Sequence, residues 1–373
     1  MSVKRVLFFS TTMGLGGADK QVGLLAKNLS SREYDVRVIC LRPSGDMADE
    51  LEEMGLHVKS LDVNSVVELP TAMVRLWREI REFKPDVVHS HMFHSIILSR
   101  IIRPFVSPDT VISTTHNIFG AAKSKRTKLF RSIIYRLTDS FSNLLTNVSE
   151  KGMESYIKSK SVPRDKTRVV HNGIDTHEFR HRRAEGHELR EKYGLSKPFV
   201  WIAVGRLTEE KDYSTLITAF DFLSDDVALW IVGTGDLKDK LQGLVKAYGL
   251  DDQIRFFGAL QPDEICSHLN AADAFVLSSK QEGFGIAIVE AMACQLPVVT
   301  TKSGGPQDIV TEASGKIVQT QSPKQLARAM DEVMNKTPSK RDKMGVAARE
   351  RVVDEFSIES ITNDWVNVYN EFE

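Results

Sequence analysis

The sequence has few cysteines and no long apolar run. Its 373 residues include three cysteines, Cys40, Cys266 and Cys294, which form no C-x-x-C pair and no metal-ligand spacing. This pattern predicts buried free thiols in a reducing compartment. There is no run of about 18 apolar residues, so we expect no membrane-spanning helix. The start, "MSVKRVLFFS", has too short an apolar run for a signal peptide, and we expect a first strand there.

The composition is otherwise that of an ordinary soluble globular protein, with 42% apolar and 27% charged residues. The length predicts two domains. The net charge of -1 conceals an asymmetry between the two halves. Residues 1–180 carry 27 Lys and Arg against 20 Asp and Glu, a net +7, and residues 181–373 carry 22 against 30, a net -8. A basic first half and an acidic second half indicate two domains with different partners.

Strand and helix patterns alternate in two series along the chain. The first series runs from "RVLFFS" to "TRVVHNG", and the second from "FVWIAVGRL" to "PVVTT". Such alternation predicts βαβ units, and right-handed crossovers then give a doubly wound, Rossmann-like sheet in each half. We therefore predict an α/β protein with domains over 1–180 and 181–355 that face each other across a cleft. In such folds, ligands bind at the carboxyl ends of the strands.

Two polar or terminal segments fall outside this alternation. The stretch "HEFRHRRAEGHELREKYGLSKP" is polar and ends in a proline, so we place the linker at about 177–197. The last segment, 356–373, has Ile358, Ile361, Trp365 and Val368 on one helical stripe. A terminal helix of this kind is able to pack on either domain, including back on the N-terminal one.

A glycine-rich loop, "GLGGADKQVGLLAKNL", follows the first strand and leads into a helical pattern. It departs from the dinucleotide fingerprint G-x-G-x-x-G, because Asp19 stands where the third glycine belongs. The second strand ends at Leu41 and Arg42, without the acidic residue that would hold a ribose. What remains is either a plain tight turn or a loop, Gly14 to Gly17, whose backbone N–H groups approach an anion or a sugar.

The densest group of candidate site residues lies in "SSKQEGFGIAIVEAMACQLPVVTTKSGGPQDIV", residues 278–310. A strand ends here and is followed by a loop that contains Glu282, Gly283, Phe284 and Gly285. Glycines before a helix free backbone N–H groups for phosphate or sugar hydroxyls. We expect Glu290 about two turns into the helix and on roughly the same side as Glu282, because eight residues at about 100° each end about 80° past two turns. Two carboxylates at this spacing can hold a long ligand at two points.

The Glu-x7-Glu spacing in "EGFGIAIVEAMACQLPVV", followed by "SGGPQDIV", resembles the signature of the family 4 glycosyltransferases. These enzymes use nucleotide sugars, retain the anomeric configuration and have the GT-B fold. Other family segments are resembled, in order, by "GLGGADKQVGLLAKNL", "DVVHSH", "ISTTHN", "VVHNGID", "VGRLTEEKDYSTLI", "IVGTG" and "IRFFGAL". The resemblance covers nearly the whole chain, and it implies that the acceptor binds the first domain and the nucleotide sugar the second.

The resemblance also implies roles for individual residues. It places His116 and Glu282 near the reacting sugar, as the catalytic residues. The implied donor-binding residues are Gly16, Gly17, Arg206, Lys211, Gly283, Phe284, Gly285 and Glu290. Within this set, Arg206 and Lys211 would bind the diphosphate and Glu290 the ribose hydroxyls.

The chain departs from the family pattern at three positions. The family commonly has Glu, Gly and Glu where this chain has Asp19, Gln295 and Asp308. These departures bear on acceptor and sugar specificity rather than on the reaction class.

The chemistry of the charged residues agrees with these roles. A departing nucleoside diphosphate gains negative charge, which two fixed cations and a helix N-terminus stabilise as it forms. The sequence has no D-x-D pair and no cluster with metal-ligand spacing, so we expect a metal-independent enzyme without a cofactor. Retention requires either a protein nucleophile or attack on the same face within an ion pair, and the sequence leaves both open.

Two further groups of residues each have a structural and a functional interpretation. His89, His91 and His94 in "HSHMFHS" suggest a metal site, but no further ligand is evident, and we favour packing or cleft lining. Residues 121–139 combine a basic face with an apolar stripe, made of Leu129, Ile133, Ile134 and Leu137. This segment is either a solvated amphipathic helix or a contact with anionic membrane through residues 121–137. Nucleic acid is not expected, because no recognition motif accompanies the charge.

The function predicted from these observations is a cytoplasmic glycosyltransferase, at the cytoplasmic face of the membrane if the contact exists. It would move a hexose or N-acetylhexosamine from a UDP-sugar to a glycan or lipid-linked acceptor in polysaccharide or envelope glycan synthesis. An alternative is a nucleotide-sugar epimerase, but the sequence offers no second acid/base group beside His116. A sugar-phosphate phosphorylase lacks an identifiable phosphate or cofactor lysine site. A catalytically degenerate, nucleotide-sugar-binding subunit is the non-enzymatic alternative.

Overall fold

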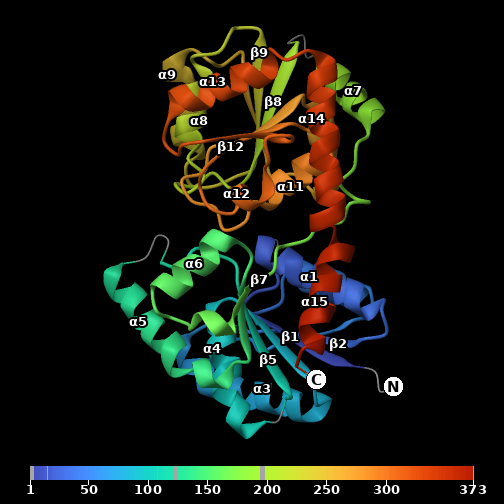
Figure 1. The fold of residues 1–373 in the computed structure, drawn as a ribbon, viewed down its shortest axis with the longest axis vertical. Coiled ribbons are helices and arrows are strands. Elements are labelled where there is room, and N and C mark those ends of the chain that lie inside the picture. The colour runs from blue at the N-terminus through green and yellow to red at the C-terminus, as the bar shows by residue number, and fades with distance from the viewer. Residues whose placement is uncertain (1–3, 15, 107, 121–123, 194–197, 373) are drawn as a thin grey trace. The chain divides into compact units, whose positions relative to one another are not determined.

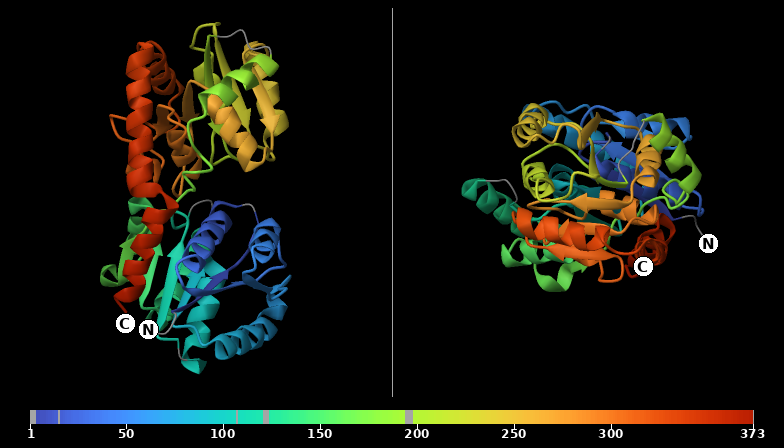
Figure 2. Two further views of the ribbon diagram at one scale, coloured as in Figure 1. Left: turned by 90° about the vertical axis from the view of Figure 1, so that its right-hand side faces the viewer. Right: turned by 90° about the horizontal axis from the view of Figure 1, so that it is seen from above.

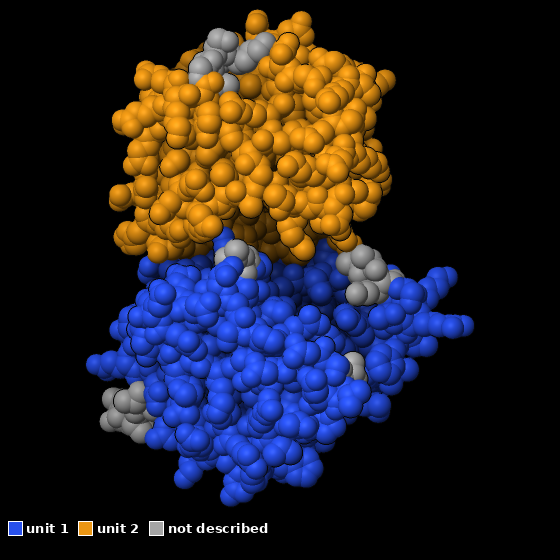
Figure 3. Space-filling view, turned by 180° about the vertical axis from the view of Figure 1, so that it is seen from behind, with its two compact units in different colours: residues 1–173, 358–373 blue, residues 174–357 orange. Residues whose placement is uncertain are grey.

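The structure of the protein is a computed structural model that describes residues 4–14, 16–106, 108–120, 124–193 and 198–372. The chain divides into two compact units, which Figure 3 distinguishes by colour. Unit 1 comprises Met1–Gly173 and Ile358–Glu373, and unit 2 comprises Ile174–Ser357. The chain therefore passes between the units at two places, after Gly173 and after Ser357.

Unit 1 is built on a parallel sheet of seven strands in the order β3-β2-β1-β4-β5-β6-β7. This is the doubly wound arrangement that the alternating patterns predict. The strands are β1 (Arg5–Ser10), β2 (Asp35–Cys40), β3 (His57–Ser60), β4 (Val87–His91), β5 (Thr110–Thr115), β6 (Leu144–Asn147) and β7 (Thr167–Val169).

The central strand β1 is buried on both faces, which explains its unbroken apolar run. Val6 and Phe8 belong to one core cluster, and Leu7 and Phe9 belong to another. Because successive side chains of a strand point to opposite faces, helices must cover both sides of this sheet. Figures 1 and 2 show these two layers of helices in unit 1.

In the part of unit 1 that the structure describes, six helices follow the strands, and a seventh comes from the far end of the chain. They are α1 (Gly17–Ser30), α2 (Asp46–Glu53), α3 (Leu69–Phe83), α4 (Phe93–Ile102), α5 (Lys125–Leu137), α6 (Glu150–Lys158) and α15 (Ile358–Asn370). Short 3₁₀ turns cover Val66–Glu68, Arg103–Phe105, Asp139–Phe141 and Arg164–Lys166.

The predicted apolar stripe of the last helix, α15, is confirmed. Ile358, Ile361, Trp365 and Val368 are all buried, and they share one core cluster with Phe8 of β1. The helix packs against α1 (Figure 1). Burial of each large apolar side chain contributes about 1.5–3 kcal/mol, so α15 is an integral part of unit 1.

Unit 2 has a second parallel sheet, with six strands in the order β10-β9-β8-β11-β12-β13. Its central strands, β8, β9, β11 and β12, are buried throughout and are apolar except for Thr300 and Thr301 of β12, as expected for a sheet covered on both faces. The strands are β8 (Phe199–Val204), β9 (Val227–Val232), β10 (Ile254–Gly258), β11 (Ala274–Leu277), β12 (Val298–Thr301) and β13 (Gly315–Val318).

The helices of unit 2 include one in the segment that we predicted as a linker. They are α7 (Arg183–Lys192), α8 (Tyr213–Phe220), α9 (Lys238–Tyr248), α10 (Pro262–Ala271), α11 (Ile286–Ala293), α12 (Pro306–Ile309), α13 (Pro323–Met334) and α14 (Pro338–Arg351), which continues into a π-helical turn, Val352–Phe356. The linker prediction is wrong for residues 177–193, because α7 packs against α10 within unit 2; residues 194–197 lie outside the described residues. Gly186 permits this close approach, since a Cβ there would lie 2.1 Å from the Asn270 carbonyl oxygen.

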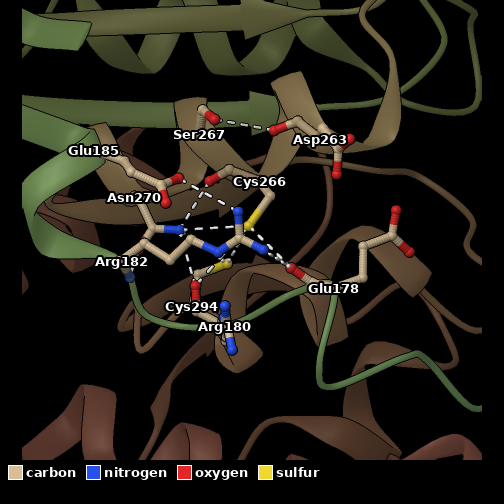
Figure 4. A network of polar contacts seen from close by, with 9 residues as sticks. All are labelled: Glu178, Arg180, Arg182, Glu185, Asp263, Cys266, Ser267, Asn270 and Cys294. Atoms are coloured by element: carbon tan, nitrogen blue, oxygen red, sulfur yellow. Dashed lines mark hydrogen bonds and ion pairs between the residues drawn. The ribbon is translucent and has the colours of Figure 1, made fainter. Parts of the chain in front are cut away.

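The chain just before α7 is hydrogen-bonded to Asn270 and Cys266 of α10 (Figure 4). The side-chain amide of Asn270 donates a hydrogen bond to the backbone carbonyl of Arg180 at 2.9 Å. The side-chain oxygen of Asn270 accepts a hydrogen bond from the backbone N–H of Arg182. Beside it, the sulfur atoms of Cys266 and Cys294 lie 4.0 Å apart. The prediction of buried free thiols is confirmed for all three cysteines.

Candidate active site

The predicted glycine loop of unit 2 lies between β11 and α11, at the carboxyl end of the sheet. Gly285 is the residue before the helix and has φ +113°, a conformation that favours glycine. The loop backbone is held by a neighbouring turn, in which Glu282 N–H donates to Ser303 and Gly305 N–H donates to Glu282. A Cβ on Gly305 would lie 2.3 Å from the Phe284 Cα, so this turn approaches the loop too closely for any side chain.

Glu282 of this loop forms an ion pair with Lys211 of the loop between β8 and α8, although 70 residues lie between them in sequence. Both side chains are largely buried, with 19% of Lys211 and 14% of Glu282 exposed. Ser279 donates a second hydrogen bond to the same carboxylate oxygen at 3.3 Å. Burial of this kind makes the pair stronger than one in water, and it leaves each charge dependent on its partner.

The backbone that carries Lys211 is fixed to the end of β11. The Ser278 hydroxyl donates to the carbonyl of Lys211 at 3.1 Å and to that of Asp212 at 2.9 Å. Asp212 adopts φ +48° directly before α8, which turns the chain at this point. Arg206 lies just beyond β8 and has an exposed side chain. The carboxyl end of this sheet thus brings together one exposed cation, one buried cation and the loop of Glu282.

The structure corrects the predicted relation between Glu282 and Glu290. Helix α11 begins at Ile286, so Glu282 precedes it and Glu290 is its fifth residue, about one turn in rather than two. The rotation estimated from eight helical residues does not apply, because Glu282 to Gly285 are outside the helix. Glu290 is buried, with 6% of its surface exposed.

In unit 1, the predicted glycine loop precedes the N-terminus of α1. Gly16 is the N-cap residue and Gly17 the first helical residue, and both are exposed. Asp19 points back into the loop, where it accepts from the Gly14 N–H at 3.1 Å and the Thr12 hydroxyl at 2.9 Å. Burial raises the pKa of Asp19, while these hydrogen bonds oppose the rise. Asp19, which departs from the dinucleotide fingerprint, therefore stabilises the loop through its hydrogen bonds to Gly14 and Thr12.

His116 comes directly after β5 and makes a hydrogen bond with His91, the last residue of β4. The distance between His91 Nδ1 and His116 Nε2 is 2.9 Å. Burial lowers the pKa of His116 to about 4 and that of His91 well below its ordinary value. Both imidazoles are therefore neutral at physiological pH.

His89 has a packing role, as favoured from the sequence. Its two ring nitrogens are hydrogen-bonded to Tyr369 at 2.8 Å and Thr114 at 2.6 Å, and its ring lies against Trp365. His94 is exposed on α4. Within the described ranges, no three His, Cys, Asp or Glu side chains are grouped as metal ligands would be.

Comparisons with known proteins match both units. The model of glycosyl transferases group 1 matches residues 186–351, and that of glycosyltransferase family 4 matches residues 15–178. An uncharacterized glycosyltransferase of Methanocaldococcus jannaschii is 31% identical over 297 residues, which are 77% of this chain and 75% of the relative. The chain belongs to the family 4 glycosyltransferases.

Other relatives share this assignment. A GDP-mannose-dependent phosphatidylinositol monomannoside mannosyltransferase of Mycobacterium tuberculosis is 28% identical, over 90% of each chain. A UDP-Gal:GlcNAc-diphosphoundecaprenol galactosyltransferase of Escherichia coli is 28% identical, over 76% of this chain and 75% of the relative. The crystal structure of HepE from Anabaena, in complex with UDP and glucose, superimposes with a TM-score of 0.87 at 21% identity, covering 99% and 100% of the chains. The glycosyltransferase thus has the GT-B fold, with two Rossmann-like parallel sheets.

Helix α5 of the glycosyltransferase exposes three of the four apolar residues that were predicted as its stripe and also Phe130, while the fourth, Ile134, is half-buried. The exposed fractions are 64% for Leu129, 62% for Phe130, 46% for Ile133 and 72% for Leu137. The inward side is formed by Ser132 and Tyr135 instead. The apolar stripe of this helix is therefore directed away from the core of unit 1.

In the part of the chain that the structure describes, no helix has the length and apolar character needed to span a membrane.

Sequence reasoning missed several residues that shape the glycosyltransferase site. Ser278 and Ser279 hold Lys211 and Glu282, and Gly305 packs against the loop. The position of Ser278 and Ser279 directly after β11 is a signal that could have identified these two residues. His91 was assigned to packing or lining, and only the fold shows that it contacts His116.

Proposed function

We propose that the protein is a retaining, metal-independent glycosyltransferase that takes a hexose or an N-acetylhexosamine from a nucleotide sugar. The observation that carries the proposal is the Lys211–Glu282 ion pair at the glycine loop before α11. A largely buried cation and carboxylate, next to the N-terminus of α11, suit a ligand that combines a diphosphate with a sugar.

The negative charge of the leaving group determines which residues we expect to bind it. As the bond to the nucleoside diphosphate breaks, negative charge grows on the phosphate, and Arg206, Lys211 and the N-terminus of α11 are positive groups at the carboxyl end of the sheet of unit 2. An incoming phosphate would compete with Glu282 for the Lys211 ammonium and release the carboxylate toward the sugar. Cations of the chain can thereby do the work that a metal ion does in other enzymes.

The remaining contacts that we propose for the donor come from the glycine loop, from α11 and from unit 1. The backbone of Gly283, Phe284 and Gly285 would meet the sugar hydroxyls and the phosphates, and Glu290 would hold the ribose hydroxyls. From unit 1, Gly16 and Gly17 would contribute the exposed N-terminal turn of α1, and His116 would lie near the reacting sugar.

Our proposal for the donor and the acceptor is based on two of the relatives. The Escherichia coli relative uses UDP-Gal and a diphosphoundecaprenol-linked acceptor, while the mycobacterial one uses GDP-mannose and a phosphatidylinositol mannoside. Both acceptors carry a lipid. We propose a UDP-sugar as donor and a glycan or lipid-linked acceptor in the synthesis of polysaccharide or envelope glycan, with the enzyme at the cytoplasmic face of the membrane.

Helix α5 supplies the surface for such a location. Its four exposed apolar side chains are accompanied by Lys125, Arg126, Lys128, Arg131 and Arg136, and the helix contains no acidic residue. Cations near an anionic bilayer contribute about 1 kcal/mol each, and exposed apolar side chains can enter the interface. We therefore propose that α5 contacts the anionic membrane surface on which a lipid-linked acceptor resides.

A donor screen followed by an acceptor assay tests the proposed function. Nucleotide sugars with UDP and GDP are compared by thermal shift, since a ligand at 100 times its Kd stabilises by about 2.7 kcal/mol. The best donor is then incubated with and without acceptor, and free nucleoside diphosphate is measured. Acceptor-dependent release with an α-linked product from an α-donor supports retaining transfer. Conversion of the donor sugar without release would indicate an epimerase, and binding without turnover a degenerate subunit.

A further inference from the structure

Two cysteine thiols, those of Cys266 and Cys294, lie next to each other in the interior of unit 2. Cys266 is on α10 and Cys294 is the C-cap residue of α11, and both side chains are buried. Their sulfur atoms are 4.0 Å apart. A disulfide bond is about 2 Å long, so the two sulfur atoms would have to approach each other by about 2 Å to form one. The remaining cysteine, Cys40, belongs to unit 1.

The polar groups around this pair favour a negative charge on the Cys266 sulfur. The side-chain nitrogen of Asn270 lies 3.5 Å from Cys266 Sγ and 3.7 Å from Cys294 Sγ. The Arg182 guanidinium lies beside Cys266 (Figure 4). Its Nε is buried and has no hydrogen-bond partner among the residues that the structure describes. Both side chains thus place positively polarised N–H groups near the pair.

The two thiols differ in acidity. The hydrogen bond with Cys294 lowers the pKa of Cys266 to about 7, although burial opposes this change. Arg182 lowers the pKa of Cys266 further, and Glu185 acts against it. The same hydrogen bond, together with burial, raises the pKa of Cys294 well above its ordinary value. Since the thiolate is the reactive form of cysteine, Cys266 is the nucleophile of the pair and Cys294 keeps its proton.

A cavity of about 230 Å³ reaches the pair from the surface of unit 2. Its walls include the exposed residues His181 and His187, and they also include Cys294 and Asn270. A water molecule occupies about 30 Å³, so a molecule as small as hydrogen peroxide fits in this space. Because Asn270 lies close to both sulfur atoms, movement of this one side chain extends the cavity to Cys266.

We propose that Cys266 and Cys294 form a reversible disulfide, in which Cys266 reacts first with hydrogen peroxide and Cys294 then displaces the added oxygen. In the first step, the Cys266 thiolate bonds to one peroxide oxygen and the O–O bond breaks. The other oxygen leaves as hydroxide, which takes up the proton lost by Cys266 and becomes water. Cys266 is then a sulfenic acid.

In the second step, the Cys294 sulfur attacks the Cys266 sulfur. The S–S bond forms, the S–O bond breaks, and the hydroxyl group leaves as a second water with the proton of Cys294. The two thiols have then given two electrons to one peroxide molecule. A dithiol reductant reverses the reaction by thiol–disulfide exchange, which suits a protein whose cysteines are otherwise free.

Helix α11 connects this pair to the donor loop. The helix begins at Ile286, directly after the loop, and has eight residues, which is about 12 Å in length. The backbone N–H of Cys294 donates to the carbonyl of Glu290 at 3.2 Å, one helical turn before it. A displacement of Cys294 is therefore transmitted to the residue that we propose to hold the ribose of the donor.

The end of α11 is also held from the side of α14. Arg349 donates to the carbonyl of Ala293, and a Cβ on Gly345 would lie 2.0 Å from the carbonyl oxygen of Gln295. A bond from Cys294 to α10 competes with these contacts, so disulfide formation shifts the end of α11 and lowers sugar transfer. This effect on transfer rests on the proposed function, whereas the disulfide itself does not.

Peptide mapping of the native full-length chain tests the disulfide directly. The reduced protein is treated with hydrogen peroxide at neutral pH and unfolded, and the free thiols are blocked with iodoacetamide. Trypsin cleaves after Arg255, Lys280 and Lys302, which leaves Cys266 and Cys294 in separate peptides. We expect peptide 256–280 to be linked to peptide 281–302, and dithiothreitol to separate them.

Single variants test the order of the two steps. In Cys294→Ala, Cys266 should accumulate as a sulfenic acid, which dimedone traps as an adduct. In Cys266→Ala, Cys294 should stay reduced, because its thiol keeps its proton. Cys40→Ala removes a buried cysteine of unit 1 and is the matched control, which should give the same linked peptides as the native protein. A dimedone adduct on Cys294 instead of Cys266 would overturn the assigned order.

Transfer assays test the connection to the donor loop. Peroxide should lower kcat by roughly 10- to 100-fold in the native protein and in Cys40→Ala, and dithiothreitol should restore it. Cys266→Ala should transfer sugar equally well before and after peroxide treatment. Inhibition of Cys266→Ala to the same extent would show that peroxide acts elsewhere.

The outcomes separate this inference from the function on which it partly rests. Absence of the linked peptides in native protein treated with excess peroxide would overturn the disulfide. Linked peptides with unchanged transfer would overturn the connection through α11. Linked peptides in a protein that transfers no sugar from any donor, even when reduced, would overturn the proposed function and leave the disulfide in place.

Discussion

The ammonium group of Lys211 is paired with the carboxylate of Glu282, which joins the loop after β8 to the loop after β11. Because β8 and β11 are neighbours in a parallel sheet, their carboxyl ends meet at one edge. Each charge is largely buried, so a change at either residue alters the electrostatics of the other.

Substitution of Glu282 by alanine should reduce turnover much more than nucleotide binding. The variant loses a group near the sugar, while Lys211 becomes free to pair with phosphate. We expect kcat to fall by roughly 100-fold and the Kd for nucleoside diphosphate to change by less than about threefold. Initial rates and calorimetric titration measure the two quantities. Glu209→Ala, which removes an exposed carboxylate nearby, is the matched control and should affect neither. Unchanged transfer in Glu282→Ala across several donors would refute the assigned role.

Substitution of Lys211 by alanine should weaken both binding and turnover. The variant removes a charge-assisted contact to phosphate and leaves Glu282 buried without its cation, so we expect the nucleotide Kd to rise by about 10- to 100-fold. Lys240→Ala, a change of an exposed lysine in α9, serves as the control. If nucleotide affinity stayed the same in Lys211→Ala, the diphosphate would have to bind elsewhere.

Gly305→Ala should destabilise unit 2 and distort the donor loop. The added methyl group would overlap the Phe284 backbone, with the Cβ 2.3 Å from both its Cα and its carbonyl oxygen. We expect a loss of about 1–3 kcal/mol in the free energy of unfolding, together with weaker nucleotide binding. Gly243→Ala in α9 has open space around its Cβ and should instead stabilise by about 0.5–1 kcal/mol. Urea denaturation compares the two, and equal effects would contradict this account.

The buried histidines of unit 1 should make the protein less stable as the pH falls below neutrality. Burial lowers the pKa of His89, His91 and His116, the last from 6.5 to about 4. Between about 6.5 and 4 the unfolded chain binds more protons than the folded one, so this stability is fully present above that window and is lost within it.

His91→Gln provides the matched measurement, because it removes one of these groups. Each histidine that stays neutral in the fold costs about 1.4 kcal/mol when the pH lies one unit below the pKa of the unfolded chain. The decrease in unfolding free energy between about pH 7.5 and 5.5 should therefore be smaller by about 1.4 kcal/mol in His91→Gln than in the native protein. Parallel pH profiles for the two proteins would show that His91 is not held neutral.

The α5 surface should bind vesicles that contain anionic lipid. Replacement of Phe130 and Leu137 by serine removes two side chains that are 62% and 72% exposed, so it should weaken co-sedimentation without reducing stability. Higher salt should weaken binding further, since the cations of α5 act through screened electrostatics. Val67→Ser removes a similarly exposed apolar side chain, 87% exposed in unit 1, and should have no effect. Equal binding to neutral and anionic vesicles would contradict a role for these cations.

The sheets and the main site residues could be predicted because both depend on local pattern. Alternating apolar segments determine where strands and crossover helices occur, and parallel strands bring their carboxyl ends together. Lys211 and Glu282 could therefore be placed at one edge, although 70 residues separate them. The stripe of α15 was equally clear, since four apolar side chains recur at helical spacing.

What the sequence could not provide depends on contacts between distant segments. The start of α11 at Ile286 depends on the turn around Gly305, which holds the preceding loop out of the helix. Helix α7 was overlooked because its sequence is polar, and it is packed through the close contact of Gly186 with α10. The contact of His91 with His116 requires the register of β4 and β5, which no local pattern specifies.

Unit 1 is formed by two separate segments of the chain, and this affects how the protein can fold during synthesis. Trp365 and Tyr369 of α15 contact His89 in the middle of the first sheet, and translation reaches them last among the contacts of that core. Ribosome-bound nascent chains that end before Ile358 should therefore hold an incomplete N-terminal core, even though unit 2 has already been translated in full. Proteolysis of stalled chains should show protection of residues 174–357 before protection of residues 4–173.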